Sequence, residues 1–106
     1  MIYHVTAKLR PQAAANLLEK LTDGSIENQR PDGAEIVASM KRAVINAGGE
    51  VEWSEMCYCN PPLAHERATV LDFHFDDITT EPIKKHEVYV GQPLVDYLRT
   101  LASKER

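Results

Sequence analysis

The sequence predicts an α+β protein in which helices cover one face of a four-stranded, mostly antiparallel sheet. Two observations carry this prediction. Apolar residues alternate with polar residues in four short segments, as they do along half-buried strands. In three other segments they recur every three to four residues, as they do along amphipathic helices. The chain has 106 residues, so we expect a single domain over residues 1–106.

The first part of the chain predicts one strand and two helices. Residues 2–9 alternate, and Pro11 suits the first turn of a helix over residues 11–22. A polar loop leads to a second helix over residues 33–46, whose start at Asp32 fits a capping box with aspartate in place of serine or threonine. Two glycines follow and favour an end of the helix there.

The rest of the chain predicts three more strands and a last helix. Alternation predicts strands over 50–59, 68–76 and 83–90, and apolar spacing predicts a helix over 94–102. The resulting order, β-α-α-β-β-β-α, is ferredoxin-like in architecture, with one helix displaced to the C-terminal end. The first crossover is then expected to leave strands 2–9 and 50–59 parallel and apart.

Composition sets expectations about partners and location. The formal net charge is −4 and the basic residues are scattered. This argues against nucleic acid and against an anionic membrane as partners, because both favour a basic patch. No apolar run reaches the length of a membrane span, and we expect no secretory signal. The two cysteines are then expected to be free thiols in a reducing compartment, so we expect a cytoplasmic protein.

The segment MCYCNPPLAHER holds the first candidate site. Cys57, Cys59 and His65 are ligand types that zinc prefers, but a structural zinc site needs four. A fourth ligand would have to come from Asp72 or His74. A reactive cysteine–histidine pair is an alternative. A loop that shapes or rims a pocket without chemistry of its own is another, and it is favoured because two prolines stiffen the segment.

The second candidate site lies on the sheet face away from the helices. His4, His74 and His86 fall at even positions of predicted strands, and Asp72 shares the face of His74. Imidazole and carboxylate groups together can bind a divalent metal or carry acid–base chemistry. A solvated sheet face shows the same alternation without any function, so both interpretations stay open. The residues expected to contact a ligand are His4, His65, Arg67, Asp72, His74 and His86.

These observations favour a small soluble homodimer that binds a small molecule or a protein partner. Helices on one face leave the other face open, and an apolar patch there with Ile2, Val70 and Val88 would suit a two-fold interface. A ligand would then meet the open face and the 60–67 loop. The alternative is a metal-binding protein or small enzyme that uses the His/Asp or the Cys/His cluster. We expect no cofactor other than such a metal, because the phosphate-loop, serine-hydrolase, metalloprotease and EF-hand motifs do not occur.

Overall fold

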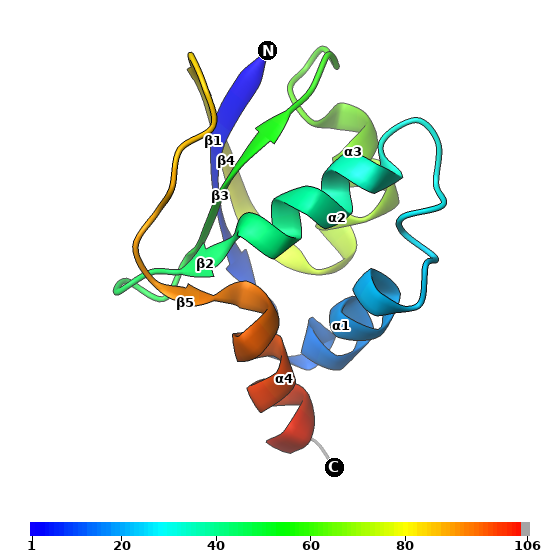
Figure 1. Ribbon diagram of the computed structural model, residues 1–106, viewed down its shortest axis with the longest axis vertical. Helices are drawn as coiled ribbons and strands as arrows, with labels where there is room; N and C mark the ends of the chain where they lie inside the picture. Colours follow the sequence, from blue (N-terminus) through cyan, green and yellow to red (C-terminus); the bar gives the residue numbers. More distant parts are fainter. Residues whose placement is uncertain (105–106) are drawn as a thin grey trace.

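The computed structural model describes residues 1–104 as an α+β fold, which confirms the predicted class. One open antiparallel sheet has the strand order β4-β1-β3-β2-β5, so the predicted count of four strands is wrong. Figure 1 shows the sheet close to edge-on, with α1, α2 and α3 on one side of it. The strands are β1 (Ile2–Leu9), β2 (Val44–Ile45), β3 (Val51–Met56), β4 (Phe75–Ile83) and β5 (Gln92–Pro93), and the helices are α1 (Ala14–Thr22), α2 (Gly33–Arg42), α3 (Ala64–Thr69) and α4 (Leu94–Lys104).

Strand β1 lies inside the sheet, between β4 at one edge and β3 in the middle. It pairs antiparallel with β3 on one side and with β4 on the other. Tyr3, Val5 and Ala7 are buried, whereas His4 and Thr6 between them are only half-buried. The alternation predicted for residues 2–9 is therefore confirmed. It orients one face of β1 toward the core that the sheet shares with the helices.

The prediction that residues 50–59 form a strand parallel to the first one and apart from it is wrong. Helix α2 ends at Arg42 instead of residue 46, and Val44 and Ile45 form β2. A tight turn follows, in which the Asn46 side-chain oxygen accepts hydrogen bonds from backbone N–H groups of Gly48 and Glu50, both at 3.0 Å. The chain thus returns as β3, which pairs directly with β1. A two-residue strand has no periodicity that a sequence pattern could detect.

The predicted strand over residues 68–76 is also wrong. Helix α3 ends at Thr69, a 3₁₀ turn covers Leu71–Phe73, and β4 begins only at Phe75. Val70 and Leu71 are both buried, although successive residues of a strand point to opposite faces. Phe73, which alternation assigns to the core, is 64% exposed. The apolar residues of this segment follow helical turns, and alternation over so few positions does not distinguish the two.

The predicted strand over residues 83–90 is replaced by a segment, residues 84–91, that we call the strap. No strand pairing involves it in the described part of the chain. The strap crosses the helix-free side of the sheet (Figure 1), where Tyr89 stacks on His4 with ring centroids 4.6 Å apart. The Ser54 hydroxyl lies 2.7 Å from Nδ1 of His86. The strap therefore covers part of the face that was expected to be open.

The apolar patch expected on that face is not assembled. Val70 is buried under the helices, and Val88 is fully exposed on the strap. The main core lies instead between the sheet and the helices, where Trp53 and Phe75 meet with ring centroids 5.5 Å apart. None of the helices within residues 1–104 combines the length and apolar character that crossing a membrane requires.

His74 belongs to this core rather than to the helix-free face. Its side chain is 3% exposed. Its Nδ1 donates to the carbonyl oxygen of Val70 at 2.8 Å, and its Nε2 lies 2.9 Å from Oδ1 of Asn16. Burial lowers the pKa of His74 below its ordinary value of 6.5. The ring thus joins the turn before β4 to helix α1.

We predict that His74→Ala lowers the free energy of unfolding by about 2–3 kcal/mol, because it removes the buried hydrogen bond to Val70 and the contact with Asn16 and leaves a small cavity. The substitution should also weaken the acid sensitivity of the fold. A histidine whose pKa is lowered by folding contributes its full stability above its ordinary pKa, and that contribution is lost as the pH falls below it. Urea denaturation at about pH 7.5 and about pH 5.5 measures both effects. If both proteins lose the same amount of stability between these two pH values, His74 is not a source of the acid sensitivity of the fold.

Candidate metal centre

A cleft of about 470 Å³ opens between the start of α2 and the segment that joins β3 to α3. In Figure 1 these parts meet in the upper half of the view, where the start of α2 faces the loop before α3. The cleft combines carboxylate, thiol, imidazole and thioether side chains. Its walls are formed by Pro31, Asp32, Glu35, Met56, Cys57, Tyr58, Cys59 and His65.

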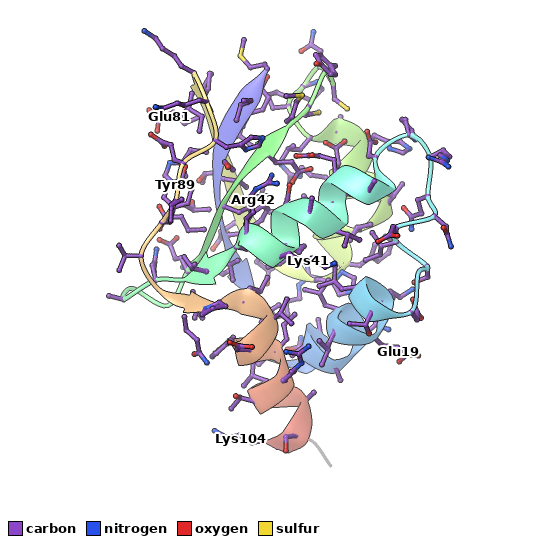
Figure 2. The ribbon with its side chains drawn as sticks, in the orientation of Figure 1. Glu19, Lys41, Arg42, Glu81, Tyr89 and Lys104 are labelled. Carbon is purple, nitrogen blue, oxygen red and sulfur yellow. The ribbon has the colours of Figure 1, made fainter. Side chains whose placement is uncertain are left out.

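The cleft exists because β3 continues past the end of its neighbour β2, which pairs only with the first two residues of β3. The free edge of β3 beyond that point is satisfied by side chains of α2. Arg42 donates to the carbonyl oxygen of Ser54 at 2.9 Å, and the N–H of Met56 donates to Glu35 at 3.0 Å. Figure 2 shows Arg42 between α2 and β3. The side chains of Arg42 and Glu35 are themselves 3.3 Å apart. These charged side chains lie between the helix and the strand and keep the two apart.

The first set of potential ligands joins two cysteines to a buried glutamate. The sulfur atoms of Cys57 and Cys59 and a carboxylate oxygen of Glu66 all lie within 4.8 Å of one another. The Cys59 thiol donates to Oε1 of Glu66 at 3.4 Å. Glu66 is 1% exposed and Cys57 is 4% exposed. This group of side chains is therefore shielded from solvent, and burial raises the pKa of the Cys57 thiol to about 12.

The second set shares Glu66 and reaches the start of α2. Asp32, His65 and Glu66 offer ligand atoms that lie within 4.8 Å of one another. His65 and Asp32 are hydrogen-bonded through their side chains. Successive residues of a helix point about 100° apart. His65 can therefore face Asp32 on the outside of α3 while Glu66 points inward.

Glu55 is a second buried carboxylate that interacts with Glu66. It lies on the inward face of β3, its side chain is 0% exposed, and its Oε1 accepts a hydrogen bond from the Trp53 indole at 2.9 Å. Its Oε2 is buried and has no hydrogen-bond partner among the described residues. Burial, and then the nearby charges of Glu66 and Glu35, raise the pKa of Glu55 to about 8. A buried carboxylate oxygen without a partner is costly in a folded protein.

Three of the residues proposed from the sequence meet in this region. Cys57, Cys59 and His65 lie around Glu66, which stands where a ligand from Asp72 or His74 was expected. Asp72 is instead exposed on the surface. It accepts a hydrogen bond from Arg67 at 3.1 Å, and His74 lies in the core described above.

The remaining two histidines lie on the other side of the sheet. His4 and His86 face its helix-free side, as expected, but neither is near Asp72 or His74. His4 is 2.7 Å from Glu52, which also accepts a hydrogen bond from Asn46 at 3.2 Å. Together with the Tyr89 stack and the Ser54 contact, these hydrogen bonds explain the polar groups of this face as links between the sheet and the strap.

Four residues of the site were not proposed from the sequence: Asp32 as a ligand, Glu35, Glu55 and Glu66. Glu66 directly follows His65 in the same conspicuous segment, so its residue type was a usable signal. Glu55 alternates with Trp53 and Cys57 along β3, which marks an acidic residue on an otherwise apolar face. Asp32 and Glu35 come close only through the packing of α2 against β3.

A smaller cavity of about 200 Å³ lies beside His74 and is lined in part by Lys20, Gln29 and Phe73. The titratable residues described at its wall are Lys20 and His74. A metal site needs several carboxylate, thiol or imidazole groups together. This cavity therefore suits a metal ion less well than the region around Glu66.

Comparison of the chain with protein families, characterised proteins and solved structures gave no match.

We predict that Glu55→Gln stabilises the metal-free protein at alkaline pH. Folded Glu55 keeps its proton up to about pH 8, whereas in the unfolded chain the carboxyl loses it near its ordinary pKa of 4.5. The stability of the unsubstituted protein must then fall as the pH rises through this interval. At about pH 8, the variant should gain a few kcal/mol in the free energy of unfolding, because one unit of pKa shift corresponds to about 1.4 kcal/mol. Denaturant titrations in the presence of a chelator measure this gain.

Glu19→Gln is the matched control, because Glu19 lies on the exposed side of α1 (Figure 2) and loses the same charge without any burial. The control should leave the pH dependence of stability unchanged. A Glu55→Gln protein that is no more stable than the control at alkaline pH would show that burial does not hold the proton on Glu55.

Proposed function

We propose that the protein binds a divalent cation of the zinc class through Cys57, Cys59 and Glu66. The adjoining cleft then admits a small-molecule ligand to that ion. The observation that carries the proposal is the convergence of these three ligand atoms within 4.8 Å, from the end of β3 and from α3. Thiolate sulfur and carboxylate oxygen are both established zinc ligands. The set is formed within a compact, mostly buried region, so little ordering is needed for binding.

The charge around this set supports a cation there. Glu55 and Glu66 are buried, and no salt bridge to either is found in the described part of the chain. The Arg42 guanidinium on α2 is already paired with the Glu35 carboxylate and with the backbone at the edge of β3. Buried carboxylates require a compensating charge or a proton. A divalent ion would supply that charge and would give the unpartnered oxygen of Glu55 a positive group to face.

Three protein ligands leave one position of a tetrahedral ion free. Zinc sites of this kind hold water or a substrate at the fourth position, whereas structural sites are closed by four protein ligands. The cleft of about 470 Å³ beside the cysteines falls within the range of about 300–1,000 Å³ typical of small-molecule sites. We therefore assign the ligand to this cleft and not to the helix-free sheet face, where the strap is bound.

The finer architecture that we propose is ferredoxin-like. The order β1, α1 and α2, β2, β3, α3, β4 follows the β-α-β-β-α-β pattern of such folds if α1 and α2 together count as the first crossover. Strand β5 and helix α4 extend it. The homodimer predicted from the sequence stays a prediction, which the molar mass of the protein in solution tests.

We predict that the untagged protein, purified under reducing conditions without chelator, contains about one zinc ion per chain. Cys59→Ser and Glu66→Gln should each weaken zinc binding by more than about 10-fold, since even the loss of an outer-shell partner has effects of that size. His86→Ala, a substitution on the strap, should leave zinc binding unchanged. Metal analysis and competition with a coloured zinc chelator provide the two measurements.

The proposal fails if the folded, reduced protein neither contains zinc nor binds it in competition with a weak chelator. It also fails if Cys59→Ser and Glu66→Gln bind zinc as tightly as the His86→Ala control.

A further inference from the structure

We infer that the cleft holds a second divalent cation on Asp32 and His65, and that Glu66 bridges it to the ion on Cys57 and Cys59. This inference rests on the proposed zinc site and extends it to a two-metal centre. The juxtaposition that carries it is the pair of ligand sets around one buried carboxylate.

The two sets have Glu66 in common and otherwise come from different elements. Cys57 and Cys59 follow the end of β3, whereas Asp32 precedes α2 and His65 lies on α3. A carboxylate has two oxygens and four lone-pair sites, so it can bind two cations at once. Oε1 of Glu66 already accepts a hydrogen bond from the Cys59 thiol. Glu66 is thus positioned as a shared ligand and not as a member of one set alone.

The chemistry of the two sets differs in the way expected for two ions. The cysteine set offers soft sulfur ligands, which favour zinc and similar ions, whereas imidazole and carboxylate together suit zinc, iron and manganese. A tetrahedral ion accepts four ligands. Asp32, His65, Glu66 and the two cysteines offer five, so a single tetrahedral ion cannot use them all.

The balance of charge also favours two ions. Asp32 and Glu66 carry negative charge when ionised, and metal binding adds two thiolates. One divalent ion would leave half of this charge uncompensated in a region where Glu66 is buried. The unpartnered Oε2 of Glu55 is an independent sign that the region lacks a positive or donor group.

The second ion would face the cleft, because Asp32 and His65 form part of its wall. Ions that share a bridging ligand in two-metal sites lie about 3.5–4 Å apart, and together they bind the oxygens of a substrate oxyanion. The class of ligand that this centre would take is therefore an oxyanion, such as a phosphate ester or a carboxylate.

Cobalt(II) titration of the chelator-treated, reduced protein tests the inference, since cobalt replaces zinc and absorbs strongly when bound to thiolate. We expect two cobalt ions per chain by equilibrium dialysis, with the sulfur-to-cobalt absorption complete after the first equivalent. His65→Ala should retain that absorption and lose one ion, with a loss of affinity of more than about 10-fold at the second site. Cys59→Ser should lose the absorption, and Glu66→Gln should weaken the binding of both ions. The His86→Ala control should bind two ions. If His65→Ala does not fold, Asp32→Asn provides another variant that removes a ligand of the second ion.

The outcomes separate this inference from the proposed function. A single bound ion with thiolate absorption that His65→Ala and Asp32→Asn leave intact would overturn the second site and preserve the first. Two ions that both survive these substitutions would overturn the assignment to Asp32 and His65. Failure of the unsubstituted protein to bind any cobalt would overturn both.

To test the oxyanion class, inorganic phosphate is added to the protein loaded with two cobalt ions. Phosphate should change the cobalt spectrum of this protein at a lower concentration than that of the loaded His65→Ala protein, whose single ion keeps one open position. An equal response, or none, in both proteins would overturn the oxyanion assignment.

Discussion

The unequal length of two neighbouring strands is the constraint on which this structure depends. Strand β3 continues beyond β2, so its last residues have backbone groups that no strand can satisfy. Unpaired buried backbone groups are costly, and α2 supplies the partners through Glu35 and Arg42. Side-chain contacts hold the helix farther from the strand than a paired strand would lie. The cleft, the cysteines and the buried carboxylates all occupy the space that results.

Two fully buried glutamates in a domain of this size require a compensating interaction. Burial of an ionised carboxylate without a partner is so unfavourable that the group either keeps its proton or binds a cation. Residues 1–104 supply two partial compensations, the Trp53 indole that donates to Glu55 and the Cys59 thiol that donates to Glu66. The carboxylate of Glu66 lies where cysteine, histidine and aspartate side chains converge. The same feature that weakens the metal-free fold is the basis of the metal binding that we propose.

Much of the fold could be predicted from local patterns, and the exceptions have physical causes. Strand β1 and helices α1 and α2 have clear periodicities, so their existence followed from the sequence. Strand β2 is too short for any periodicity, and missing it reversed the expected relation of β1 to β3. At the site, cysteine and histidine spacing indicated three candidate ligands, two thiols and one imidazole, in one segment. Glu66 acquires its role only because the segment ends in a helix that turns it inward, and Asp32 joins through tertiary packing, which no local pattern contains.

The place of β1 between two strands has a consequence for how the chain reaches its folded state. Both partners of β1 lie far along the chain, since Val5 pairs with Trp53 on one side and with Thr80 on the other. During synthesis β1 leaves the ribosome before both partners, so its two edges stay open until β3 and β4 have been translated. Contacts between such distant segments slow folding, because large loops must close before any pairing is gained. Until they close, the open edges of β1 are a template for pairing with a neighbouring chain.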